Sequence, residues 1–351
     1  MKDEKKVWAA GMFIAAIVSG IILISTSFGA SGTKQSEAKK QKSGLISGIA
    51  ANYAQDAGIA GDAVVIFADD FESWKGDGTT KPDDKWTSLR VNDSGRTSAV
   101  GGAVTIDDKK CRGERILEIA NWHTGNAGGG SGGISIHLGN YAGSSEGLGD
   151  GYEDIYVRYY LKFYEDYKAV RNHGANLGGR DVTQEGARWV GQANTPDVAA
   201  QGYFFSGVQP RGTLGSREIH LGFYSYHMDK KGPWGDGYDF IKKIPIEPGR
   251  WYCVERHMKL NSVNPLKADG LEELWIDGEL SVRQEGLRFR KVPQLKINFF
   301  SLENYYHGLP EEYTRENPVR VYFDNVVIAH KYIGTMGPAE KGSQASANKQ
   351  K

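Results

Sequence analysis

The stretch that most constrains the fold is WYCVERHMKLNSVNPLKADGLEELWIDGE, residues 251–279. Tyr252, Val254, Met258 and Leu260 share one parity in its first ten residues, and the alternation returns in LEELWI, which is the period of a strand with one buried face. Asp277-Gly278 favours a tight hairpin turn after the second strand. The polar face of the first strand carries three residues that either bind substrate or form a solvated, ion-paired surface: Glu255, His257 and Lys259.

The same period-two alternation recurs along most of the chain. It marks strands at 115–120, 133–138, 154–164, 202–209, 219–228 and 295–302, between an opening strand in 64–74 and a closing strand in 319–334. No long window has helical amphipathicity, and 46 glycines suit many short strands joined by tight turns. We therefore predict an all-β domain over residues 63–336, a single antiparallel β-sandwich of the jelly-roll type with a concave groove.

The two ends differ from this domain in composition. A lysine-rich head and an uncharged apolar run over 7–24 make residues 1–31 a signal peptide or an N-terminal membrane anchor, so we expect export and, if the anchor is retained, a membrane tether. Residues 32–62 predict a flexible linker, and residues 337–351 a disordered tail.

Charge and cysteine content exclude several classes of protein. Lys+Arg and Asp+Glu both number 43, and no basic block accompanies aromatic residues, so no nucleic-acid partner is expected. Cys111 and Cys253 are the only cysteines, which rules out a disulfide-dense scaffold and leaves open whether these two form a bridge. Nothing in the sequence predicts an organic cofactor.

Several short segments, taken together, resemble one family. They are YVRYYLKF, HGANLGG at 173–179, FYSY, WYCVE, LWIDG and YFDNVVIA. The combination resembles the jelly-roll, concanavalin-like polysaccharide lyases that act on uronic-acid polymers such as alginate and glucuronan, whereas FDNV and WIDG also occur in non-catalytic laminin-G-like sandwiches. The resemblance implies an exported lyase that cleaves an anionic polysaccharide by β-elimination. The alternative is a non-catalytic carbohydrate-binding or adhesion module at the cell surface.

β-Elimination on a uronate requires a group that neutralises the sugar carboxylate, a base and an acid. The resemblance assigns these catalytic roles to His173, Asn176, Tyr224 and Tyr226. Asn176 stands where the lyases have a lysine, and Gly207 stands where they have an arginine. Further substrate contacts are expected from residues nearby on the same strands: Gln209, Arg211 and His220.

Two further hypotheses concern carboxylates. Sandwiches of this kind often hold a structural calcium ion between the first and last strands, and Glu72 with Asp324 would supply oxygen ligands. Glycoside hydrolysis would instead need two carboxylates across the groove, for which Glu255 and Glu273 are the pair on adjacent strands.

Overall fold

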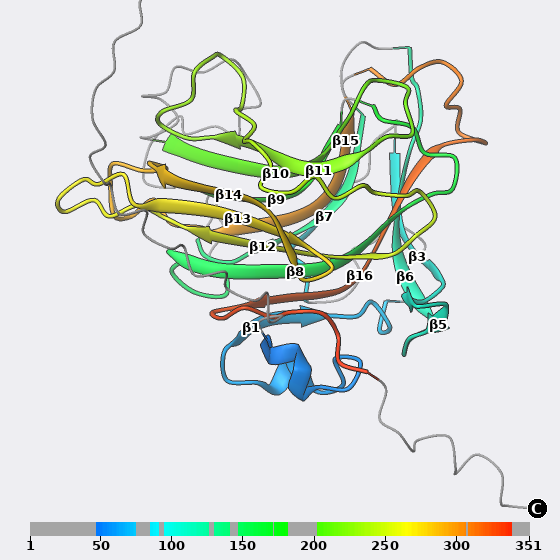
Figure 1. Ribbon diagram of the computed structural model, residues 1–351, viewed down its shortest axis with the longest axis horizontal. Coiled ribbons are helices and arrows are strands. Elements are labelled where there is room, and N and C mark those ends of the chain that lie inside the picture. The colour runs from blue at the N-terminus through cyan, green and yellow to red at the C-terminus, as the bar shows by residue number, and fades with distance from the viewer. Residues whose placement is uncertain are drawn as a thin grey trace, which may run out of the picture. The chain divides into compact units, whose positions relative to one another are not determined.

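The computed structural model describes residues 47–74, 85–90, 95–125, 130–140, 147–170, 172–181, 202–306 and 308–338. They form sixteen strands and two short 3-10 helices (Figure 1). The helices are η1 (Ile49–Asn52) and η2 (Ile59–Gly61). The strands are β1 (Val65–Asp69), β2 (Ser88–Arg90), β3 (Gly95–Gly101), β4 (Thr105–Ile106), β5 (Lys109–Lys110), β6 (Arg115–Asn121), β7 (Gly130–His137), β8 (Asp154–Phe163), β9 (Asn172–Arg180), β10 (Tyr203–Arg211), β11 (His220–Tyr226), β12 (Tyr252–Lys259), β13 (Gly270–Ile276), β14 (Glu279–Leu287), β15 (Phe299–Tyr306) and β16 (Val319–Ala329). No helix in these ranges is long and apolar enough to cross a membrane.

Fourteen of these strands form two stacked antiparallel sheets, and β4 and β5 pair separately with each other. The eight-stranded sheet has the order β14-β13-β12-β8-β16-β6-β3, with β1 paired to β16, and the six-stranded sheet has the order β11-β10-β9-β15-β7-β2. Consecutive strands pair within β12-β13-β14 and β9-β10-β11, whereas pairs such as β8–β16 and β15–β7 join distant parts of the sequence, as expected for a jelly roll. The predicted all-β sandwich is confirmed.

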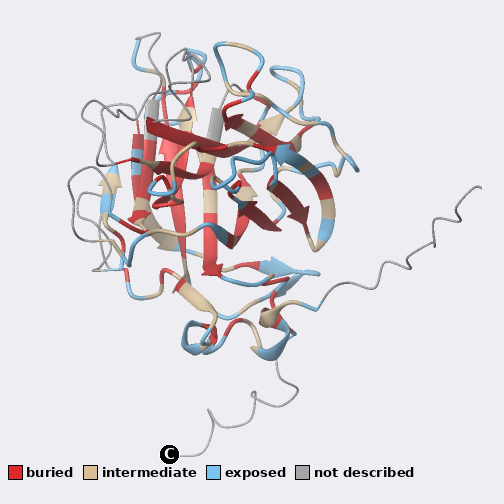
Figure 2. Ribbon diagram, turned by 90° about the vertical axis from the view of Figure 1, so that its left-hand side faces the viewer, coloured by how far each residue is buried: buried red, intermediate tan, exposed pale blue. Residues whose placement is uncertain are grey.

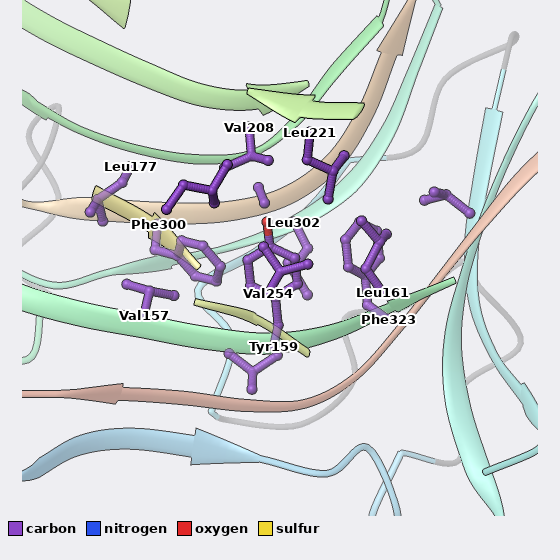
Figure 3. Close-up of a cluster of buried hydrophobic side chains, with 14 of the residues drawn as sticks. Val157, Tyr159, Leu161, Leu177, Val208, Leu221, Val254, Phe300, Leu302 and Phe323 are labelled. Carbon is purple, nitrogen blue, oxygen red and sulfur yellow. The ribbon is translucent and has the colours of Figure 1, made fainter. Parts of the chain in front are cut away.

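The core between the sheets follows the alternation read from the sequence. Val157, Tyr159 and Leu161 of β8 are buried, as their shared parity predicts. Figure 3 shows how side chains of both sheets meet there, with Val254 and Phe323 on one side and Leu177, Phe300 and Leu302 on the other. Burying each such side chain stabilises the fold by about 1.5–3 kcal/mol. Burial follows the strands, and exposed positions concentrate in the loops (Figure 2).

One charged pair lies within this apolar core. Arg256 of β12 and Glu272 of β13 are both fully buried, and Arg256 Nη2 donates to Glu272 Oε1 at 2.9 Å. Arg256 also crosses to the six-stranded sheet, where it donates to the Ser206 carbonyl at 2.8 Å and the Ala175 carbonyl at 3.1 Å. Glu272 accepts from the Ser225 hydroxyl at 2.6 Å. The pair therefore bonds two strands of one sheet to three strands of the other.

The folded unit begins earlier than the sequence predicts. Residues 47–62, expected to be the end of a linker, form η1 and η2 and pack against β16. Ala50 and Ile59 are buried there, and the Ala50 amide donates to the Ile333 carbonyl at 2.9 Å. A few apolar residues without sustained periodicity are enough to hold the segment, because β16 leaves an apolar outer surface for them to cover. Gly337, assigned to the tail, bridges to Ala54.

Other expectations about the ends lie outside the described residues, namely the segment 1–31, the linker up to residue 46, and the tail from residue 339. The two cysteines are free thiols, although both border the same small cluster around Tyr160 and Trp251. The bridge that the sequence left open is therefore not formed.

The buried pair leads to a stability prediction. Arg256→Met should destabilise the protein by about 3–5 kcal/mol in urea unfolding, because it leaves the Glu272 carboxylate buried without its cation. The double variant Arg256→Met/Glu272→Leu should recover part of this loss, since no unpaired charge then stays in the core.

The matched control is Lys242→Met, which breaks an exposed pair with Glu279 and should cost at most about 1 kcal/mol. Equal losses for the buried and exposed variants would contradict a central role for the Arg256–Glu272 pair.

Candidate functional site

A row of six residues, most of them polar, crosses the outer face of the six-stranded sheet, with one residue from each strand. Strand pairing places these six in register: Ser88, Ser135, Ser301, Asn176, Gly207 and Tyr224. Their sequence neighbours Ile134, Phe300 and Phe223 point into the core, so this cross-sheet row faces outward. With strands about 4.8 Å apart, the row is about 24 Å long, which suits an extended polymer.

A hollow of about 210 Å³ opens beside one half of the row, over β2, β7 and β15. Its polar lining is formed by Ser88, Arg90, Ser135, His137, Ser301 and Glu303. The predicted groove was to hold His173, Asn176, Tyr224 and Tyr226, and the two tyrosines lie on β11, at the opposite edge of the sheet from the hollow. The hollow and the tyrosine pair are therefore two separate parts of one face.

Glu303 is the buried charge of the hollow. Its side chain is 7% exposed, and it accepts a hydrogen bond from Asn176 Nδ2 and one from Arg90 Nη1 at 3.2 Å. Burial raises the pKa of this carboxyl, while Arg90 and the Asn176 amide act against the rise. A carboxyl with a raised pKa inside a cleft is a candidate for proton transfer or ligand recognition.

Asn176 lies at the centre of the row and is fully buried. Its Nδ2 donates to Glu303 and to the Ser301 hydroxyl at 3.3 Å, while its Oδ1 is buried without a hydrogen-bond partner. The preceding residue, Ala175, has a φ of 46°, in the left-handed region that non-glycine residues rarely adopt. Arg256 binds the carbonyl of this strained residue from the core, and so helps to hold the backbone from which Asn176 projects.

The tyrosine pair on β11 is held together by its hydroxyls, which lie 3.1 Å apart. Tyr226 is 2% exposed, whereas Tyr224 is half-buried. Burial raises the pKa of Tyr226, and the hydrogen bond with Tyr224 raises it further. A Cβ atom at Gly235 would lie 3.1 Å from both rings, so the 231–237 loop packs closely on the pair. Tyr226 therefore holds its proton more tightly than a free tyrosine, and its hydroxyl can orient that of the more exposed Tyr224.

Tyr305 of β15 connects the two parts of the face. It is half-buried, and burial raises its pKa, as do the nearby Glu303 carboxylate and, to a smaller extent, Tyr224. His173 pairs with Tyr305 in backbone register, which brings its strand position to the same region. The His173 side chain lies outside the described residues.

Three predicted substrate contacts, Gln209, Arg211 and His220, lie on β10 and β11 and are engaged within the protein. Arg211 Nη2 donates to the Phe223 carbonyl, and burial lowers the Arg211 pKa. With its amide oriented toward Arg211, Gln209 accepts from Arg211 Nε at 3.0 Å. His220 Nδ1 lies 3.1 Å from the Ile244 carbonyl. These contacts fix the sheet edge and its neighbouring loop.

The other three predicted substrate contacts lie on β12 of the opposite sheet, away from the cross-sheet row: Glu255, His257 and Lys259. Glu255 is buried and accepts from the Ile333 and Gly334 amides, both at 2.7 Å. His257 lies between two carboxylates, Asp154 at 2.6 Å and Glu273 at 2.9 Å. Lys259 is exposed. The sequence assigned a polar face correctly but could not tell which sheet borders the groove.

The two carboxylates of the glycosidase hypothesis, Glu255 and Glu273, lie on the same sheet as these residues. Glu273 accepts from Arg283 at 2.7 Å as well as contacting His257, and Glu255 is capped by the backbone amides. Because both carboxylates are held by internal partners outside the hollow, their arrangement does not describe a glycosidase site.

Glu72 and Asp324, the two carboxylates of the calcium hypothesis, would not by themselves supply enough oxygen ligands for the ion. Glu72 Oε1 accepts from the Glu114 and Arg115 amides, and Asp324 Oδ1 accepts from the Asn325 amide. Burial raises the pKa of Asp324, and the neighbouring Asp70, Glu72 and Asp69 carboxylates raise it further. Within the described ranges no three His, Cys, Asp or Glu side chains form a metal-binding group, whereas calcium takes about 6–8 oxygen ligands. The ion stays a prediction.

Sequence reasoning missed the residues that line the hollow, above all Glu303 and Arg90. A signal for Glu303 was present: the alternation that made Ser301 outward-facing extends to Glu303 and Tyr305 in SLENYY, but the predicted strand ended at residue 302. Arg256 was missed too, because its parity places it on the core face, where an arginine is unexpected.

Comparison with protein families matches residues 241–326 to the polysaccharide lyase 14 family. The matched segment includes β12 to β15 and most of β16, hence Glu303, and it excludes Asn176 and the tyrosine pair. The resemblance to the jelly-roll lyases is thereby confirmed. The protein is a jelly-roll sandwich that is similar to the polysaccharide lyase 14 family over residues 241–326.

Several solved structures are similar. The PL-14 alginate lyase from Aplysia kurodai is 14% identical, and the match covers 76% of this chain and 99% of that chain with a TM-score of 0.49. The endo-β-1,4-glucuronan lyase from Trichoderma reesei is also 14% identical, and the match covers 76% of this chain and 95% of that chain with a TM-score of 0.46. A mutant of alginate lyase Aly36B in complex with an alginate trisaccharide is 17% identical, and the match covers 61% of this chain and 81% of that chain with a TM-score of 0.45. At these scores no residue role rests on the similarity. Among curated proteins no sequence matches the chain.

Glu255 gives a prediction for the pH dependence of stability. Burial raises its pKa from 4.5 to about 7, although the hydrogen bonds from the two backbone amides act to lower it. The folded state therefore keeps a proton that the unfolded chain has lost, so this group's contribution to stability falls as the pH rises through that window, by up to about 1.4 kcal/mol per pH unit.

Melting curves of Glu255→Gln should accordingly depend less on pH across this window than those of the wild type. The exposed Glu312→Gln is the control and should keep the wild-type dependence. Parallel curves for Glu255→Gln and wild type would show that Glu255 titrates normally.

Proposed function

We propose that this protein is an exported polysaccharide lyase that binds an anionic, uronate-containing polymer along the cross-sheet row and cleaves it by β-elimination. The observation that carries the proposal is the row itself: it is about the length of an extended oligosaccharide and ends at a tyrosine pair whose hydroxyls are hydrogen-bonded to each other. The match to the polysaccharide lyase 14 family supports the same reaction class.

The proposed roles follow from exposure and protonation. Tyr224, the more exposed member of the pair, donates a proton to the departing oxygen, while buried Tyr226 orients its hydroxyl. His173 serves as the base, because its strand position lies opposite Tyr305 on the same sheet. Asn176 lies between these groups and hydrogen-bonds the sugar carboxylate once its amide is released from Glu303. No nucleophile is needed, since elimination forms no covalent intermediate with the enzyme.

A non-catalytic carbohydrate-binding module is the second candidate, and one observation favours it. Both amide hydrogens of Asn176 point toward internal acceptors, Ser301 and Glu303, so the group expected to neutralise a carboxylate is engaged elsewhere. Together with Gly207 in place of an arginine, this fits a groove that binds a polymer without cleaving it.

Single hydroxyl deletions test the catalytic proposal. Tyr224→Phe should lower turnover on a polyuronate by about a hundredfold or more, the scale of general acid catalysis. Tyr226→Phe should cost only about 0.5–1.5 kcal/mol in kcat/KM, because it removes one supporting hydrogen bond. Turnover is followed by the ultraviolet absorbance of the unsaturated product.

Tyr322→Phe, a half-buried tyrosine on β16 of the other sheet, is the matched control and should leave turnover unchanged. If the parent protein binds but does not cleave any of alginate, glucuronan or polygalacturonate, and Tyr224→Phe binds equally well, the lyase proposal fails and the binding module replaces it.

A further inference from the structure

The hollow over β2, β7 and β15 is chemically different from the tyrosine end of the row. Three serine hydroxyls from three adjacent strands line it: Ser88, Ser135 and Ser301. Ser88 Oγ and Ser135 Oγ lie 2.6 Å apart, so one donates to the other and the second hydroxyl keeps its hydrogen for a ligand. Ser301 Oγ accepts from Asn176, which leaves its own hydrogen to donate.

The charges of the hollow cancel internally. Arg90 and Glu303 form an ion pair at 3.2 Å, with the Arg90 side chain 49% exposed and that of Glu303 7% exposed. Arg90 is the single Lys or Arg among the described residues that line the hollow. A uronate bound here would bring its carboxylate next to Glu303 and would compete with Glu303 for Arg90, and like charges that close repel.

Sugar hydroxyls meet no such obstacle. They donate to and accept from serine hydroxyls, and a carboxylate such as Glu303 accepts from hydroxyl donors. Phe299 supplies an apolar patch in the same lining, which suits the C–H face of a sugar ring.

We propose that this hollow is a subsite for an uncharged pyranose, with Glu303 as the residue that excludes a uronate from it. The proposal rests on the proposed function only in taking a polysaccharide as the ligand. It adds that the polymer recognised is mixed, with a neutral sugar at the hollow and the uronate nearer to Asn176 and Tyr224.

Calorimetric titration of the full-length protein with tetrasaccharides tests this subsite. The neutral probes are cellotetraose and mannotetraose, and the charged probes are the tetramers of glucuronate and mannuronate. The wild type should bind its better neutral probe at least about tenfold more tightly than either charged probe. Glu303→Gln should reduce this preference at least about fivefold, mainly by tighter binding of the charged probes.

A second variant guards against a folding defect in Glu303→Gln. Ser135→Ala should weaken binding of the neutral probe about fivefold or more, because it removes a hydroxyl from the hollow. Ser281→Ala, on β14 of the other sheet, should leave both affinities unchanged.

Three results overturn the subsite: charged tetramers bound more tightly than neutral ones by the wild type, an unaltered preference in a folded Glu303→Gln, or no binding of any probe. The lyase assay is read separately, and for the subsite it includes a polymer that alternates glucuronate with a neutral sugar. Cleavage of a polyuronate without a neutral preference rejects the subsite and keeps the lyase. A neutral preference without cleavage of either the polyuronates or the mixed polymer keeps the subsite and rejects the lyase.

Discussion

The buried pair of Arg256 and Glu272 is the interaction on which the arrangement of this sandwich most depends. An isolated charge in an apolar core is very unfavourable, so each member requires the other and every hydrogen bond around them. Three of their partners, the carbonyls of Ala175 and Ser206 and the hydroxyl of Ser225, belong to the six-stranded sheet, and the Tyr238 hydroxyl also donates to Glu272. The two sheets are therefore fixed by directional bonds as well as by apolar packing, which has no strict register of its own.

These bonds end next to the candidate site. Ala175 precedes Asn176, Ser206 precedes Gly207, and Ser225 lies between the two tyrosines. Alternation of side chains along a strand places each anchored residue in the core and its neighbour on the outer face. A contact inside the sandwich thus holds the cross-sheet row in position, including the left-handed backbone at Ala175.

The outer face combines an end suited to proton transfer with an end suited to recognition. At the tyrosine end, burial raises the pKa of Tyr226, whose hydroxyl contacts that of Tyr224, whereas at the other end the Glu303 carboxylate is paired with Arg90 inside a polar hollow. Asn176 lies between the two ends, and its amide is the point where they interact. Asn176 therefore couples the two ends, because its amide shares its hydrogens with Ser301 and Glu303 at the hollow.

The sequence by itself determined the fold class and which residues share a face, because period-two alternation follows directly from backbone geometry. It placed Tyr224 with Tyr226 and His220, and Glu255 with His257 and Lys259, on correct faces. Only the tertiary structure decided which of those faces borders the hollow, since strand order depends on contacts between residues far apart in the chain. The same long-range pairing aligned Ser88, Ser135 and Ser301, brought Arg90 to Glu303 across 213 positions, and buried Arg256 where parity alone predicted an apolar side chain.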